Sequence, residues 1–141
     1  MKKIKFLMVG LFLSLIVTGC FETNITDEQA RKLPVCVETS DNVYTMSQGS
    51  IGEVGDYYNQ AFGKETYEMY PRKGGKQLIF KVNNETILMD TNYIELEKGA
   101  CMEISHVIVK DKNGKKGLEA DSSNSTDYRT LTKVAEYVFK F

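Results

Sequence analysis

The chain has 141 residues, with 18 Lys and Arg against 19 Asp and Glu and a formal net charge of -1. A chain of this length has room for one ordinary hydrophobic core, so large multidomain enzymes are excluded. The first 19 residues also differ from the rest in composition, which argues against a single domain that spans the whole sequence.

The N-terminus combines a basic start with a short apolar run. Lys2, Lys3 and Lys5 precede an apolar stretch at residues 6–17. This stretch is shorter than the roughly 20 residues that a membrane-spanning helix needs, and it is typical of a signal peptide. Removal of residues 1–19 leaves 122 residues with 15 basic and 19 acidic side chains, a formal net charge of -4. Such a mildly acidic protein gives no general reason to expect nucleic acid as a partner.

The apolar run ends in Val17-Thr18-Gly19-Cys20. This tetrapeptide resembles the lipobox of bacterial lipoproteins, in which an aliphatic and two small residues precede a cysteine that is acylated and becomes the first residue. The resemblance implies a covalent lipid on Cys20 and attachment to a bilayer. Phe21 follows, where Asp is associated with inner-membrane retention in enteric bacteria, so we expect the outer membrane, facing the periplasm. A buried or paired cysteine after a membrane anchor is disfavoured because the run is too short to span.

The remaining two cysteines form a natural pair. If Cys20 carries the lipid, Cys36 and Cys101 are left in an oxidising compartment, where a disulfide is the expected state. A disulfide between Cys36 and Cys101 would close a loop of about 65 residues, which chain-entropy models associate with a stabilisation of about 4 kcal/mol. A metal site or a catalytic thiol is disfavoured, because there is no CxxC and His106 is the only histidine. We therefore expect no metal and no cofactor apart from the lipid.

Residues 20–33 are polar, lack a sustained strand pattern and stop at Pro34. They predict a lipidated tether, within which residues 26–32 could form a helical turn capped by Thr26, too short to be stable alone.

From Pro34 onward, residues 34–141 predict one domain of short strands. We expect them at residues 34–38, 42–47, 65–70, 77–82, 85–89, 93–97, 101–110 and 128–141. Asn83-Asn84 and Asn113-Gly114 are typical of tight hairpin turns. The pattern favours an all-β fold, a small antiparallel immunoglobulin-like sandwich of about seven strands.

Two details of this pattern bear on the outcome. Within 101–110, Met102, Ile104, His106 and Ile108 are expected on one face of the strand. The end of the chain could be a short helix over residues 130–138, but a strand is preferred because Tyr137, Phe139 and Phe141 alternate.

The sequence offers no set of catalytic residues that a motif supports. His106 stands in an apolar strand without a local nucleophile motif, which favours a structural or surface role. The pairs Glu95/Glu97 and Asp121/Asp127 could bind a cation or act on a sugar, although alternating Glu on a strand usually marks its solvated face. Gly49, Gly52 and Gly55 do not match a phosphate-binding loop and predict a flexible turn region.

The stretch from Ser47 to Lys76 is the most informative for binding. It is rich in Gly, Ser, Asn and Gln, and its aromatic residues are candidate partner-binding anchors. These anchors are Tyr57, Tyr58, Phe62, Tyr67 and Tyr70. An equally open alternative is that the tyrosines pack in the core or at a sheet edge.

The cysteine neighbourhoods, at residues 34–37 and 98–101, together with the lipobox and the aromatic C-terminus, resemble the small periplasmic lipoproteins proposed as type VI secretion immunity proteins. That resemblance implies an immunoglobulin-like sandwich with one disulfide and a secreted toxin as partner. The expected function is therefore a non-catalytic, membrane-tethered protein-binding module. The alternatives are a structural or assembly lipoprotein of an envelope or secretion machine and, third, a small envelope hydrolase that uses His106 or an acidic pair.

Overall fold

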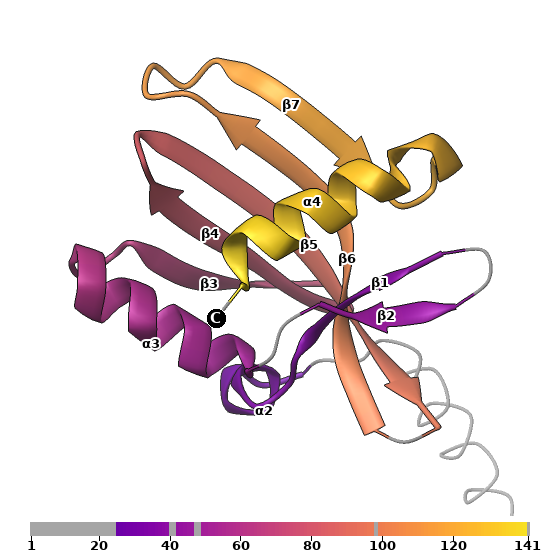
Figure 1. Cartoon of the computed structure of the whole chain (residues 1–141). Coiled ribbons are helices and arrows are strands. Elements are labelled where there is room, and N and C mark those ends of the chain that lie inside the picture. The colour runs from indigo at the N-terminus through magenta and orange to yellow at the C-terminus, as the bar shows by residue number, and fades with distance from the viewer. Residues whose placement is uncertain (1–24, 40–41, 47–48, 98, 141) are drawn as a thin grey trace, which may run out of the picture.

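The computed structural model describes residues 25–39, 42–46, 49–97 and 99–140 (Figure 1). The predictions of a signal peptide and of an acylated Cys20 lie outside these residues. The strands are β1 (Val35–Glu38), β2 (Val43–Thr45), β3 (Tyr67–Arg72), β4 (Gly75–Val82), β5 (Glu85–Leu96), β6 (Gly99–Lys110) and β7 (Lys116–Asp121). The helices are α2 (Asp27–Arg31), α3 (Ile51–Phe62), the short 3-10 helix η1 (Ser125–Asp127) and α4 (Tyr128–Val138).

All seven strands belong to one sheet, in the order β2-β1-β6-β5-β4-β3, with β7 also paired to β6. β1 and β6 run parallel, and the other pairs are antiparallel. The long strand β6 has β5 along one edge, whereas β1 and β7 share its other edge. Along that shared edge β1 pairs at Met102 and Glu103, and β7 pairs from His106 onward.

The prediction of an all-β fold with about seven strands and one disulfide is confirmed in a fold that is mostly β, with seven strands and the Cys36–Cys101 bridge. Two features go beyond the prediction: the strands form one continuous sheet, and α3 and α4 supply core residues against one of its faces (Figure 1). Residues from both helices share the core with strand residues such as Leu78, Phe80 and Met89.

The predicted C-terminal strand is wrong, because residues 128–138 form α4. Leu131, Val134, Ala135 and Val138 are all buried, and their spacing of three and four is that of one helical face. The alternation of Tyr137, Phe139 and Phe141, which favoured a strand, does not correspond to a strand face, since Tyr137 is exposed and lies in the helix.

The predicted flexible turn region is also wrong, because residues 51–62 form α3. Its N-terminus carries a capping box in which Ser50 and Glu53 bond reciprocally. Gly52 and Gly55 are buried on the helix, and their spacing of three puts them on one face. The ring of Tyr67 fills the space above Gly55, where an added Cβ would lie 2.4 Å from ring carbons. These glycines thus permit close packing of a helix.

The predicted tether extends too far along the chain. Thr26 caps α2 in a capping box with Gln29, and Ala30 is fully buried. Ile25 is also buried in the core. The folded domain therefore includes residues 25–33, and Pro34 is not its boundary.

Three further differences concern the strands. The predicted strands 85–89 and 93–97 are one continuous strand, β5. β7 was not expected, because all its residues except Ala120 and Asp121 are exposed and the pattern gives no apolar face. A register shift opposite Asp90/Thr91 leaves Ser105 as an extra residue in β6. Ile104 is consequently buried, whereas His106 projects from the opposite face to the buried Val107, so the single face predicted for 102–108 is wrong.

The turn predictions fare better. Asn83 and Asn84 have φ angles of 53° and 64° between β4 and β5, as a two-residue hairpin of this type requires. Gly114 has a φ of 83° in the turn between β6 and β7.

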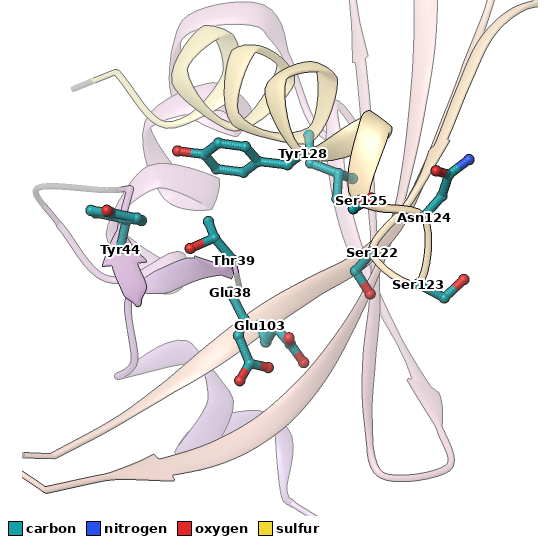
Figure 2. A pocket seen from close by; sticks show the side chains of 10 residues that line it. Glu38, Thr39, Tyr44, Glu103, Ser122, Ser123, Asn124, Ser125 and Tyr128 are labelled. Carbon is teal, nitrogen blue, oxygen red and sulfur yellow. The ribbon is translucent and has the colours of Figure 1, made fainter. Parts of the chain in front are cut away.

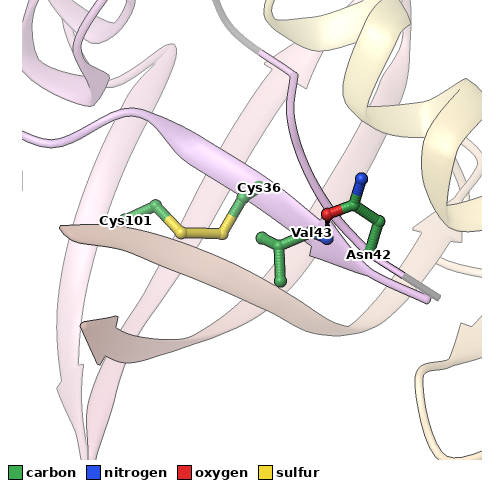
Figure 3. The surroundings of a disulfide bond; sticks show 4 residues. All are labelled: Cys36, Asn42, Val43 and Cys101. Atoms are coloured by element: carbon green, nitrogen blue, oxygen red, sulfur yellow. Dashed lines mark hydrogen bonds between the residues drawn. A yellow bond between two sulfur atoms is a disulfide. The ribbon is translucent and has the colours of Figure 1, made fainter. Parts of the chain in front are cut away.

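The disulfide joins Cys36 in β1 to Cys101 in β6, with 6.0 Å between the Cα atoms (Figure 3). It spans 65 residues of sequence and cross-links the two parallel strands. The bridge therefore fixes β1 to β6, and the edge strand β2 is attached through its pairing with β1, in which Val43 is opposite Glu38 (Figure 3).

Candidate functional site

A cavity of about 470 Å³ opens where β1 and β7 part along the shared edge of β6. The end of β1 forms one side, the loop after β7 forms the other, and Tyr128 and Leu131 of α4 complete it (Figure 2). Its lining residues are Glu38, Thr39, Tyr44, Glu103, Ser122, Ser123, Asn124, Ser125, Tyr128 and Leu131.

Two carboxyl groups lie together in this cavity. Figure 2 shows the side chains of Glu38 and Glu103 next to each other. Glu103 is only 9% exposed. Burial raises the pKa of Glu103 to about 7, and the hydrogen bond with Glu38 and the charge of Glu38 add to the increase. The pair therefore holds a proton at pH values where an ordinary glutamate has lost it.

The sequence explains why these two groups meet. Each glutamate follows a disulfide-bonded cysteine by two residues, as Cys36-Val37-Glu38 and Cys101-Met102-Glu103. Residues i and i+2 of a strand point to the same face, so each glutamate projects on the side of its cysteine. Because β1 and β6 run parallel and the bridge joins their cysteines, the glutamates are adjacent too. The repeated CxE pattern is the signal that the sequence analysis missed.

The loop beside the pair is held by its own side chains. Asp121 Oδ1 accepts hydrogen bonds from the backbone N and the Oγ of Ser123, at 2.8 and 2.7 Å, and these bonds lower the pKa of Asp121. Asp127 Oδ2 accepts a bond from the backbone N of Asp121 at 3.0 Å. The predicted acidic pair Asp121/Asp127 thus stabilises the loop after β7 through hydrogen bonds. The residues of this loop that line the cavity are serines and Asn124.

The cavity has a definite chemical character. Its ten lining residues include two glutamates, several hydroxyl groups and one amide, and none of them is a lysine, arginine or histidine. Such a lining can hold a shared proton, or it can accept a cationic or hydroxyl-bearing group between the carboxylates and the serines.

The five predicted anchor residues do not form one surface. Tyr58 and Tyr67 are 5% and 6% exposed and belong to the core, so the alternative reading of these two tyrosines is correct. Tyr70 lies on the sheet face opposite to Tyr67, where its hydroxyl donates to Glu68 at 2.9 Å. Tyr57 and Phe62 are exposed on α3.

Three exposed aromatic residues surround Tyr58, and we call them the aromatic patch: Tyr57, Phe62 and Tyr137. The rings of Tyr57 and Phe62 lie with their centroids 5.9 Å from that of Tyr58. Tyr137 of α4 is close enough to contribute to the raised pKa of Tyr58, which reaches about 12 chiefly through burial. The exposed fractions of Tyr57, Phe62 and Tyr137 are 44%, 60% and 48%.

The base of the aromatic patch is tightly held. The hydroxyl of Tyr58 donates to the carbonyl oxygen of Val138 at 2.8 Å, which joins α3 to the end of α4. Beneath it Phe80 packs edge-on, at 5.2 Å from Tyr58 and 5.5 Å from Phe139. The hydroxyl of Tyr137 accepts a hydrogen bond from Asn83 at 2.7 Å. Tyr137 was not predicted as part of a binding surface, because its segment was expected to be a strand.

His106 lies on the other side of the sheet between two carboxylates. Its Nε2 is 2.6 Å from Glu119 Oε2, and its Nδ1 is 3.6 Å from Asp90 Oδ2. Lys116 bonds the same Glu119, and together with His106 it lowers the pKa of that carboxyl. Both ring nitrogens face carboxyl groups, and these contacts do not place a nucleophile against the imidazole.

The remaining predicted pair, Glu95/Glu97, is exposed near the end of the β5–β6 hairpin. Within residues 25–39, 42–46, 49–97 and 99–140, no three His, Cys, Asp or Glu side chains gather as a metal site. None of the helices in those ranges has the length and apolar character to cross a membrane. No protein-family model, no curated protein and no solved structure matches the chain.

Proposed function

We propose that this protein is a lipid-anchored binding module of the bacterial cell envelope, which captures a protein partner through the aromatic patch and catalyses no reaction. The observation that carries the proposal is the cluster of Tyr57, Phe62 and Tyr137 around the buried Tyr58. Exposed aromatic side chains of this kind dominate the energy of many protein interfaces.

The rigidity of the aromatic patch supports the proposal. Tyr58 is fixed by its bond to Val138 and by its contact with Phe80, so the rings above it rest on an immobile base. Tyrosine and phenylalanine have few rotatable bonds, and they lose little conformational entropy when a partner covers them.

Membrane attachment is the second part of the proposal. The lipobox-like sequence before Cys20 assigns a covalent lipid to this cysteine, and the lipid is the only attached group that we propose. Phe21 after the cysteine favours the outer membrane, with the domain in the periplasm. The partner that the resemblance to immunity lipoproteins implies is a secreted toxin, which the bound module would neutralise.

The proposal is tested by photo-crosslinking in living cells. A photoreactive phenylalanine at position 62 is expected to capture a defined envelope protein. The same probe at position 70 provides the control, since Tyr70 is an exposed aromatic residue, at 43% against 60% for Phe62, on the opposite face of the sheet. The captured protein, expressed in the envelope of cells that lack this gene, is then expected to arrest growth, and the wild-type chain is expected to restore it.

Two results would contradict the proposal. Capture of the same proteins at positions 62 and 70 would show that the aromatic patch is not a specific surface. A captured protein that is harmless, together with an assembly defect in cells that lack the gene, would replace toxin neutralisation by the assembly role.

A further inference from the structure

The folded domain begins very close to the proposed lipid. Ile25 is buried, and Ala30 of α2 is fully buried. Asp27 pairs with Lys76 of β4, and Arg31 pairs with Asp56 of α3 at 2.9 Å. These contacts fix α2 to both a strand and a helix, so the chain has no free tether after Ile25.

Only a short segment therefore separates the proposed lipid on Cys20 from the folded domain, which begins at Ile25. Cys20 precedes Ile25 by five residues. A fully extended chain of that length spans at most about 18 Å. The earlier expectation of a tether through residue 33 would allow more than twice this reach. A tether this short keeps Ile25 within about 18 Å of the lipid.

Three elements lie at the end of the molecule where the described chain begins: α2, the start of α3 and the β5–β6 hairpin. α2 packs on the start of α3, where the backbone N of Ile51 donates to the carbonyl oxygen of Leu33 at 2.9 Å. Pro34, the residue after Leu33, lies beside β6 near the β5–β6 hairpin. The backbone N of Met102 donates to the carbonyl oxygen of Pro34. Figure 1 shows α2 and the end of this hairpin at one end of the molecule, opposite to the β4–β5 and β6–β7 turns.

We propose that the surface formed by α2 and the end of the β5–β6 hairpin faces the lipid headgroups, and that the aromatic patch is held away from the membrane. The inference rests on the proposed acylation of Cys20. The length of α3 gives the approximate distance between α2 and the far end of the aromatic patch. α3 starts beside α2, and its 12 residues extend about 18 Å to Phe62. The aromatic patch is thus presented to a partner that arrives from the aqueous side.

The proposed orientation follows from the short segment between Cys20 and Ile25. It does not follow from the charge of the surface formed by α2 and the end of the β5–β6 hairpin. Among the described residues of α2, the residue after it and the hairpin end, Leu96 is 36% exposed, and the exposed charged side chains are Lys32, Asp27, Glu28, Glu95 and Glu97. A surface with more acidic than basic side chains gains no electrostatic attraction to anionic lipid.

Lysine labelling on vesicles tests the orientation. The mature, full-length lipoprotein is inserted into preformed vesicles of phosphatidylethanolamine and phosphatidylglycerol and treated with a membrane-impermeant amine reagent, and modification is read by mass spectrometry. Lys32 after α2 and Lys112 in the β6–β7 turn are both exposed, so they form a matched pair. The control is the same protein with a 20-residue Gly/Ser segment inserted after Phe21.

We expect Lys32 to react several-fold more slowly in the native protein than in the extended variant, while Lys112 reacts equally in both. Equal rates at Lys32 in a protein whose intact mass includes the lipid would overturn the orientation alone. A mature protein whose mass shows no lipid on Cys20 would overturn the orientation and, separately, the proposed anchoring. The crosslinking test of the aromatic patch is independent of either result.

Discussion

Glu38 and Glu103 share a hydrogen bond in a cavity without a basic lining residue, although they lie 65 positions apart in sequence. The relationship follows from the disulfide, because each glutamate stands two residues after one of the bridged cysteines. The parallel pairing of β1 and β6 then puts both side chains on one face. The covalent bond therefore holds together two groups that repel each other when both are ionised.

The first prediction concerns stability and pH. The folded-state pKa of Glu103, about 7, lies above its ordinary value of 4.5, so the folded protein holds this proton more tightly than the unfolded chain. The stabilisation is fully present below pH 4.5 and is lost as the pH rises through 7. We expect this loss to reach up to about 3 kcal/mol in the free energy of unfolding.

Urea unfolding of the wild type, Glu103→Gln and Glu97→Gln at a series of pH values from 4 to 8 measures this effect. Glu103→Gln is expected to remove most of the decrease between pH 4.5 and 7, whereas the exposed Glu97→Gln leaves the profile unchanged. Identical pH profiles for the wild type and Glu103→Gln would show that the two carboxyl groups do not share a proton.

The second prediction couples the disulfide to the carboxyl pair. Replacement of both Cys36 and Cys101 by Ser is expected to lower the free energy of unfolding by about 4 kcal/mol, from the loop-closure entropy of the unfolded chain. At pH 8 the loss is expected to be larger in a Glu38→Gln background, because only in the wild type does breaking the bridge also relieve the repulsion between two carboxylates. A double-mutant cycle in urea measures the coupling. Simple additivity of the two changes would contradict the account of the site.

The third prediction concerns the glycines of α3. Gly55→Ala places a methyl group 2.4 Å from the ring of Tyr67, which overpacks the core. We expect the variant to lose about 1 kcal/mol or more, despite the higher helix propensity of alanine. Gly52→Ala is the control, since its added methyl group would lie 3.0 Å from side-chain atoms of Arg31, a milder contact than 2.4 Å from a buried ring. Thermal unfolding compares the two, and equal stabilities would refute the close packing of Tyr67 on Gly55.

The fourth prediction compares two buried tyrosines. The hydroxyl of Tyr58 donates to Val138, whereas that of Tyr67 is buried and has no hydrogen-bond partner among the described residues. Tyr58→Phe is therefore expected to cost about 1 kcal/mol, and Tyr67→Phe to be neutral or slightly stabilising. Calorimetric unfolding of both variants provides the measurement. The reverse order would mean that Tyr67 is bonded and Tyr58 is not.

The strands were predictable where one face is buried and the sequence alternates, as in β4, where Leu78, Phe80 and Val82 all reach the core. The turn at Asn83-Asn84 was predictable because few other residues adopt positive φ so readily. The pairing of Cys36 and Cys101 followed from the count of cysteines once Cys20 was assigned to a lipid. These are local signals, or simple arithmetic, and they do not depend on tertiary contacts.

Of the two long helices, α3 was not predicted, and α4 was given only as the alternative to a preferred strand. Gly52 and Gly55 lower the helix propensity of α3, and the helix forms because its capping box and the buried Ile51, Val54 and Tyr58 outweigh that penalty. The aromatic residues of α4 favour strands locally, whereas its four buried residues on one face require a helix. Tertiary burial thus overrode propensity in both segments.

The candidate site was only partly predictable. Tyr57 and Phe62 of the aromatic patch come from the segment that was expected to bind, but the division into buried Tyr58 and exposed Tyr57 depends on the phase of a helix that was not expected. Glu38 and Glu103 were not singled out, because their proximity depends on parallel pairing of β1 and β6. The CxE repeat becomes informative only when the disulfide and this strand direction are both known.

The affinity of the captured partner for defined variants tests the binding module most directly. Titration calorimetry is expected to show that Tyr57→Ala with Phe62→Ala weakens binding about 10-fold or more, the loss typical of an interface hot spot. Tyr70→Ala removes an equally exposed tyrosine from the opposite face and is expected to bind like the wild type. Unchanged affinity for Tyr57→Ala/Phe62→Ala, or an equal loss for Tyr70→Ala, would contradict the assignment of the aromatic patch as the partner-binding surface.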